Sequence, residues 1–241
     1  MDHGTPSPAR TAMTPVLART AMTPVLARTA VRAATATWGG ARRQQRLRVC
    51  TAADLLLARG LRVRVVNPAL AWPRGPRLVV ANAAGWTDVL ALATVVPGTP
   101  VVDAALAGTP LLRALARRGG LLVDDGSGAV RAGVTALLRA GGTVTAHPGG
   151  PAEGDDPGRF RARALAPAVD AQAAVCPVAV REVDGGVVEV HLLPALAPGR
   201  DARALAALAE YAVAHVLESG APAPSRPGRA RSRVGYGRSR T

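Results

Sequence analysis

The chain of 241 residues has no lysine, only two cysteines and very few aromatic residues. Aromatic side chains make up 2% of the chain although hydrophobic residues make up 49%, so a core must be filled mainly by Ala, Val and Leu. Proteins that read nucleic-acid bases stack them on aromatic side chains, so their scarcity argues against a nucleic-acid partner. Cys50 and Cys176 are too few for a disulfide framework or a zinc cluster. Both are therefore predicted to be reduced, structural thiols of a cytoplasmic protein.

A long apolar run is also missing. The longest candidate, residues 89–102, is broken by Pro97, Gly98 and Pro100, and it falls short of the roughly 18 apolar residues of a transmembrane helix. The N-terminus lacks the apolar region of a signal peptide. The sequence therefore predicts a cytoplasmic protein, at most peripheral on the inner face of the cell membrane.

The formal net charge of +14 is concentrated at the two ends of the chain. Residues 1–64 hold 11 Arg against two acids, and residues 221–241 hold 6 Arg and no acid. Residues 65–220 hold 13 Arg against 14 acids and are nearly neutral. Arg-rich ends suit anionic lipid headgroups, so a membrane surface with anionic lipids is a predicted partner. Solvated tails are the alternative, and the sequence leaves the oligomeric state open.

Composition divides the chain into four segments. The unit ARTAMTPVL occurs twice in tandem from Ala9, and its proline prevents a continuous helix. Residues 1–30 are therefore predicted to be a disordered low-complexity leader. Residues 31–60 suit a basic amphipathic helical segment that either lies in a membrane interface or packs on its own domain. An α/β domain is expected over residues 61–217, and a disordered Arg-rich tail over residues 218–241.

Strand-like and helix-like stretches alternate within residues 61–217. The central one is RLVVANAAGWTD at residues 77–88, where an apolar run predicts a strand buried on both faces, followed by a loop and a helix from about Trp86. Other strands are expected at 61–66, 100–102, 121–124, 143–147, 175–180 and 187–193. Other helices are expected at 110–118, 130–140, 160–174 (bent or interrupted at Pro167) and 202–217 (capped by Asp201). The order predicts an α/β fold with a mixed, mainly parallel central sheet flanked by helices, and with N-terminal helices.

Four short motifs follow one another along this alternation. The loop after the central strand has the frame N-A-A-G-W-T-D, and GGLLVDD follows at residues 119–125. HPGGPA occupies residues 147–152, and C-P-V occupies residues 176–178, with Phe160 and Arg161 between them. In this order the motifs resemble those of the glycerolipid acyltransferases of the 1-acylglycerol-3-phosphate acyltransferase type. The corresponding family motifs are N-H-x4-D, G-x-x-F-x-D-R, F-P-E-G-T-R, a basic F-K/R segment and V-P-V.

The resemblance implies an acyltransferase-like fold and the transfer of an acyl chain from acyl-CoA or acyl carrier protein to a lysophospholipid hydroxyl at the membrane surface. It also implies site residues. Asp88 is the expected catalytic carboxylate, and the expected substrate-binding residues are Asn82, Trp86, Gly150 and Arg161. No further cofactor is implied. The acidic residues Glu153, Asp155 and Asp156 could hold a hard cation, but a solvated loop is favoured and no metal is expected.

The chain departs from the family at the residues that the chemistry needs. Where the family has the His that takes a proton from the attacking hydroxyl, this chain has Ala83, and a methyl group cannot accept a proton. The Arg of the second motif is replaced by Asp125, which would repel a phosphate. Further family residues are replaced by Gly149, Pro151 and Ala152, and a cationic residue after the first helix by Asp103.

Two hypotheses follow from these departures. The first is an acyltransferase-like protein of phospholipid metabolism whose catalysis is impaired, which leaves its status as an enzyme uncertain. The second is a noncatalytic lipid or acyl-carrier binding module at the membrane surface. His147, at the end of a predicted strand, is the candidate substitute base, although a structural role is common for such a residue.

Overall fold

The structure is a computed structural model, and it describes residues 41–67, 70–82, 85–104, 121–149 and 158–219. At its centre is a seven-stranded sheet of strand order β1-β7-β6-β2-β5-β3-β4. The strands are β1 Arg62–Val66, β2 Arg77–Ala81, β3 Thr99–Asp103, β4 Leu122–Asp124, β5 Thr143–Ala146, β6 Ala174–Val183 and β7 Val187–Leu192. All neighbouring strands are parallel except β6 and β7. The predicted mixed, mainly parallel sheet is therefore confirmed.

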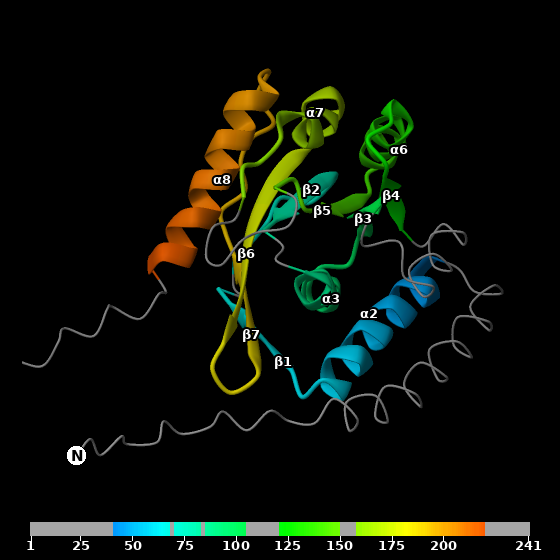
Figure 1. The fold of residues 1–241 in the computed structure, drawn as a ribbon. Helices are drawn as coiled ribbons and strands as arrows, with labels where there is room; N and C mark the ends of the chain where they lie inside the picture. The colour runs from blue at the N-terminus through cyan, green and yellow to red at the C-terminus, as the bar shows by residue number, and fades with distance from the viewer. Residues whose placement is uncertain (1–40, 68–69, 83–84, 105–120, 150–157, 220–241) are drawn as a thin grey trace, which may run out of the picture.

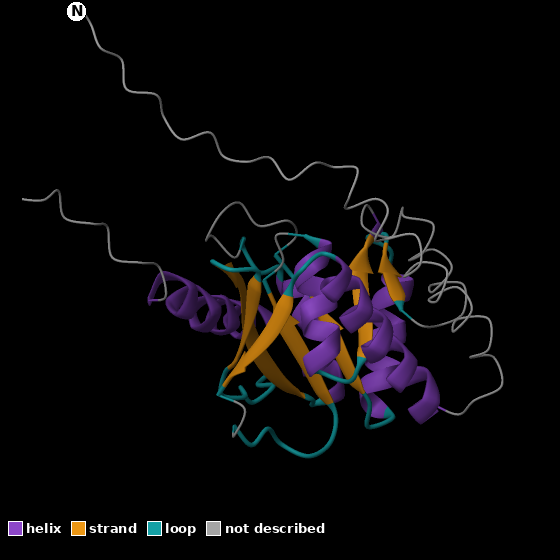
Figure 2. Ribbon diagram, turned by 90° about the horizontal axis from the view of Figure 1, so that it is seen from below, coloured by secondary structure: helices purple, strands orange, loops and turns teal. Residues whose placement is uncertain are grey.

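Helices cover both faces of this sheet, as Figures 1 and 2 show. On one face lie α2 Ala41–Ala58 and α3 Trp86–Val95, and on the other lie α6 Gly128–Arg139, α7 Ala162–Ala171 and α8 Ala202–Ser219. The chain therefore has the three-layer arrangement expected when a strand and a helix alternate along the sequence.

The central strand β2 belongs to both cores. Leu78 and Val80 pack into the cluster formed with α6, α7 and α8, whereas Val79 and Ala81 pack into the cluster on the α2 and α3 side. All four side chains are fully buried. Because successive residues of a strand point to opposite faces, a strand covered on both sides needs an unbroken apolar run, and RLVVA supplies it.

Several predicted boundaries differ from the structure by one to three residues, and those of α7 are among them. Helix α7 covers Ala162–Ala171 rather than residues 160–174, and it continues through Pro167. A proline removes one backbone donor from a helix, but the ring of Pro167 is buried in the core. The helix ends where Gln172 adopts a left-handed conformation, with φ of +50°, and Ala174 already belongs to β6.

The described part of the basic N-terminal segment packs on its own domain. Ala52, Leu55 and Leu56 of α2 are buried, and the Arg48 guanidinium donates a hydrogen bond of 3.1 Å to the Gly98 carbonyl. Of the two alternatives for residues 31–60, the packed one therefore holds for α2. Docking of this segment to a membrane stays a prediction.

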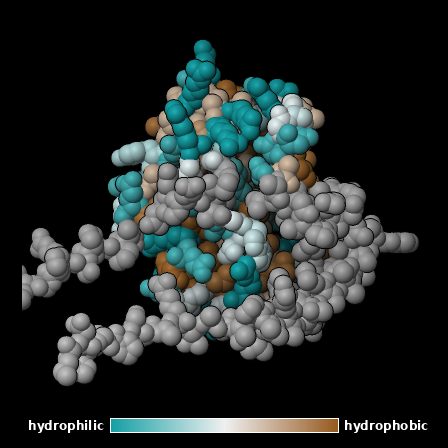
Figure 3. Space-filling model, viewed as in Figure 1, coloured by the Kyte–Doolittle hydropathy of each residue, from teal (hydrophilic) through white to brown (hydrophobic). Residues whose placement is uncertain are grey.

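Several predicted segments lie outside the described residues. These are the leader 1–30, the start of the basic segment with Trp38, the helix 110–118, the acidic loop with Glu153, and almost all of the tail 218–241. Among the helices that are described, none combines the length and apolar character needed to cross a bilayer. On the face drawn in Figure 3, hydrophilic residues dominate the upper half and apolar residues reach the surface below them.

Candidate functional site

The carboxyl ends of four parallel strands meet at one edge of the sheet. In register, Val80 of β2 pairs with Ala146 of β5, and Asp103 of β3 pairs with Asp124 of β4. The loops that follow these strands therefore lie at the same edge. In open α/β sheets, ligands bind outside the carboxyl ends of strands, so this edge is the first place to look for a site.

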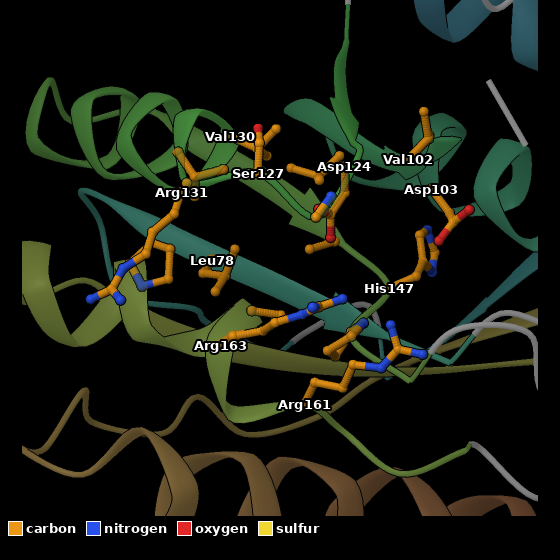
Figure 4. A pocket seen from close by; sticks show the side chains of 18 residues that line it. Leu78, Val102, Asp103, Asp124, Ser127, Val130, Arg131, His147, Arg161 and Arg163 are labelled. Carbon is orange, nitrogen blue, oxygen red and sulfur yellow. The ribbon is translucent and has the colours of Figure 1, made fainter. Parts of the chain in front are cut away.

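A cavity of about 190 Å³ opens at this edge, between α6 and α7 (Figure 4). Its floor includes Leu78 and Ala146 of the sheet, and its walls include Val130 and Val134 of α6 and Ala164 of α7. Its polar and charged lining side chains are Asp103, Asp124, Ser127, Arg131, His147, Arg161 and Arg163. The cavity thus joins an apolar interior to a charged rim.

The charges around this rim are nearly balanced. Arg131 forms an ion pair of 2.7 Å with Asp170 of α7, which leaves Arg161 and Arg163 as the cations without a carboxylate partner in the described part of the chain. Asp103 and Asp124 contribute two carboxylates. The rim therefore presents two guanidinium groups and two carboxylates rather than a cluster of one sign.

The second-motif carboxylates form the turn that leads into α6. Asp124 Oδ1 accepts a hydrogen bond of 2.9 Å from the Gly126 amide, and Asp125 Oδ1 accepts one of 2.9 Å from the Ser127 amide. The hydrogen bonds from Ser127 lower the pKa of Asp125. Asp125 is exposed and is not among the residues that line the cavity. Asp125 therefore lies outside the lining of this cavity, and its expected repulsion of a phosphate stays a prediction.

His147 follows β5 directly and lines the cavity. Its Nδ1 atom lies 3.3 Å from the main-chain oxygen of Asn82. Burial lowers the pKa of His147 to about 4, although hydrogen bonds to the Asn82 and Ala81 backbone act in the opposite direction. The imidazole is therefore neutral at physiological pH. The structure thus places His147 in the cavity, as its candidacy as a base requires, but Asp88 is not among the lining residues.

The Asn82 side chain holds two strands together. Its Nδ2 group donates a hydrogen bond of 2.7 Å to the Val180 carbonyl, and its Oδ1 atom accepts one of 2.8 Å from the Val180 amide. The side chain is buried, and it continues the β2–β6 ladder beyond the last pair, Ala81 with Val178. The amide that we expected to contact a substrate is therefore engaged in the fold. Its main-chain oxygen, in contrast, contacts His147.

Asp88 stabilises the start of α3. Its Oδ2 atom accepts a hydrogen bond of 3.2 Å from the Gly85 amide, and the residue is buried in the first turn of the helix. A carboxylate at this position satisfies an otherwise unpaired donor and interacts favourably with the helix dipole. Ala83, the position of the missing family His, lies outside the described residues.

Of the two remaining expected site residues, the structure describes Trp86 but not Gly150. The Trp86 ring lies beneath the Arg59 guanidinium, 4.6 Å from its carbon to the ring centroid. This contact joins the end of α2 to the start of α3, so Trp86 serves packing between these helices. Gly150 lies outside the described residues. For both, substrate binding stays a prediction, whereas Arg161 does line the cavity.

Comparisons with known proteins support the expected relationship. Over 149 residues the chain is 34% identical to a lyso-ornithine lipid O-acyltransferase of Pseudomonas aeruginosa, a match that covers 60% of this chain and 57% of that protein. The chain thus spans less than two thirds of the length of this relative. The crystal structure of a 1-acyl-sn-glycerophosphate acyltransferase from Thermotoga maritima has the same fold, with a TM-score of 0.67. The structural match covers 85% of this chain and 93% of the Thermotoga maritima chain, and the two sequences are 15% identical.

Part of the chain is similar in sequence to a lysolipid acyltransferase, and the chain shares the fold of another acyltransferase. No family model matches it, so the similarity rests on this sequence match and on the shared fold. Within that fold, the strand-loop-helix from β2 to α3 carries the first motif, as the sequence indicated.

Sequence reasoning missed two arginines that line the cavity, Arg131 and Arg163. Arg163 comes two residues after Arg161 at the start of α7, and both line the cavity. The sequence carried a signal for Arg163, because R-F-R-A-R at residues 159–163 is a basic run separated from the third motif by six residues. Only the packing of α7 against the sheet shows that its guanidinium reaches the same cavity as Asp124.

Proposed function

We propose that this chain binds a lysolipid and an acyl thioester, and that it transfers the acyl group to the lysolipid hydroxyl at a strongly reduced rate. The observation that carries the proposal is the position of the cavity. It opens at the sheet edge that bears the first-motif loop, in a fold shared with an acyltransferase. The apolar residues of the lining suit part of an acyl chain, and the charged rim suits a headgroup.

The reduced rate follows from Ala83. General-base catalysis typically contributes about 10² to 10⁴ in rate, and the residue at the family's base position has no group that accepts a proton. Asp88, which would orient that base, instead accepts a hydrogen bond from the Gly85 amide. The site can still position the two substrates, which accelerates a reaction between them.

The rim charges favour a zwitterionic acceptor over a phosphate monoester. A phosphate monoester carries about two negative charges near pH 7 and needs a net positive site. Here the cavity lining contains the carboxylates of Asp103 and Asp124 as well as arginines. An ornithine headgroup carries both an ammonium group and a carboxylate, and the relative in Pseudomonas aeruginosa is a lyso-ornithine lipid O-acyltransferase. We therefore propose a lyso-ornithine lipid, or another lysolipid of mixed charge, as the acceptor.

The test restores the missing base. Purified full-length protein and the variant Ala83→His are assayed with acyl-CoA and with acyl-carrier protein as donors, and with lyso-ornithine lipid and lysophosphatidic acid as acceptors. Ala83→His should raise kcat by about 10²-fold or more, and lyso-ornithine lipid should be the better acceptor. Ala84→His is the matched control, because it places the same side chain one residue out of the motif, and it should not gain activity.

Two results would contradict this proposal in different ways. Faster turnover of lysophosphatidic acid would refute the acceptor, while the acyl-transfer assignment would stand. No transfer by the wild type or by Ala83→His, together with binding of lysolipid by the wild type, would favour the noncatalytic lipid or acyl-carrier binding module instead.

Membrane docking remains part of the proposal, and the structure narrows which residues would serve it. Arg48 of α2 and Arg59, just after its end, are engaged within the domain, whereas Leu57 of α2 is 62% exposed. Flotation with anionic liposomes at low and high salt separates two modes of docking. Binding through arginine should weaken as salt rises, because salt screens exposed charges, whereas binding through apolar residues should persist.

A further inference from the structure

The residue at position 147 replaces an apolar family residue with a titratable one. By the family resemblance, the third motif begins with Phe, and this chain has His147 there. At position 83, where the resemblance implies a His, this chain has Ala. His147 lies at the carboxyl end of β5, and its ring lines the cavity. In Figure 4 the Asp103 carboxylate points toward the same part of the cavity as the His147 ring.

The hydrogen bond of His147 determines which ring nitrogen can accept a proton. Its Nδ1 atom contacts the Asn82 main-chain oxygen at 3.3 Å, and a carbonyl oxygen only accepts hydrogen bonds. Nδ1 must therefore carry the hydrogen in the neutral ring. Nε2 then has the free lone pair, which is the state that a general base requires.

The anchor of this imidazole is itself rigid. The Asn82 carbonyl belongs to a residue whose side chain makes two hydrogen bonds with the Val180 backbone. The arrangement resembles the usual one in which a His base is oriented through its other nitrogen, with a main-chain carbonyl in place of a carboxylate. The Asn82 side chain thus fixes the backbone that holds the His147 ring, at the ends of β2 and β5.

We propose that His147 is the general base of the residual acyl transfer in this protein, an inference that rests on the proposed function. Nε2 takes the proton of the lysolipid hydroxyl as its oxygen attacks the thioester carbonyl carbon. The carbon–sulfur bond then breaks, and the imidazolium returns the proton to the thiolate that leaves. The products are the diacylated lipid and the free thiol of coenzyme A or acyl carrier protein.

The protonation of His147 gives this proposal a measurable signature. Its pKa is lowered to about 4 by burial, so the base is active above that pH and is lost as pH falls through it. A low pKa also makes a weaker base, which agrees with slow turnover. The charged groups around the cavity that act on this titration are Asp103, Asp124, Arg131, Arg161 and Arg163.

The decisive variants are His147→Phe, which restores the family residue, and His147→Ala, which leaves room for a small base. His147→Phe should lower kcat by about 10²-fold or more, and added imidazole should restore part of the activity of His147→Ala. His215→Phe is the matched control, because His215 is exposed on α8 and contacts Tyr211, away from the cavity. It should keep wild-type turnover.

The readouts separate a catalytic role from a structural one. Rescue by imidazole, and an acidic limb of kcat/KM near pH 4 in the wild type, would not arise from a residue that only supports the fold. Unchanged turnover in His147→Phe would overturn the inference and leave the proposed function intact. An inactive wild type together with an active Ala83→His variant would also overturn the inference and leave the acyl-transfer assignment intact. Inactivity of both proteins would overturn the inference and the acyl-transfer assignment together.

Discussion

Replacing Asn82 by Asp should destabilise the fold strongly, although the two side chains have nearly the same size. The amide now donates to the Val180 carbonyl and accepts from the Val180 amide, at 2.7 and 2.8 Å. A carboxylate still accepts but cannot donate, so an oxygen would face the Val180 carbonyl oxygen in a buried site. A buried polar group left unsatisfied costs about 1 to 3 kcal/mol, and more if it is charged.

We therefore expect Asn82→Asp to lower the free energy of unfolding at pH 7 by about 3 kcal/mol. The loss should shrink at low pH, because a protonated carboxyl group donates to the carbonyl again. Urea unfolding followed by tryptophan fluorescence measures the effect, and Asn67→Asp is the matched control. Asn67 is exposed, so its substitution should change the free energy by less than about 0.5 kcal/mol. An Asn82→Asp protein as stable as this control would refute the structural role of the amide.

Three further predictions concern stability. Asp88→Ala should cost about 1 kcal/mol by removing the helix cap, which thermal unfolding can measure. The pKa of Glu189 is lowered to about 2, first by the hydrogen bond from Arg64 and then by Arg181 and His191. Glu189→Gln should therefore cost about 1 kcal/mol at pH 7, and the difference from the wild type should fade as pH falls from 4.5 toward 2; a difference that is constant over this range would contradict it. Gly186→Ala should destabilise by about 1 kcal/mol or more, because φ is +72° and a Cβ would lie 2.8 Å from the Gly60 oxygen; hydrogen exchange at the turn would report it.

The sequence by itself determined the order and type of the elements. An apolar run without alternation at residues 77–81 indicated a strand covered on both faces, and β2 is buried on both. Gly141 predicted the end of the preceding helix, and its φ of +81° shows why glycine is suited there. Asp201 predicted a helix start, and its carboxylate accepts a hydrogen bond of 2.8 Å from the Arg203 amide. These are local effects of backbone geometry and burial, which neighbouring residues fix.

Only the tertiary structure decided which side chains share the site. His147 and Asn82 are 65 positions apart in the chain, and their contact follows from the pairing of β2 with β5. Arg163 reaches the cavity because α7 packs against the sheet. In the same way, the two carboxylates of the second motif differ in position, because Asp124 lines the cavity and Asp125 is exposed. Motif spacing gives the residues that are present, whereas side-chain partners depend on how distant strands and helices pack, and no local pattern encodes that.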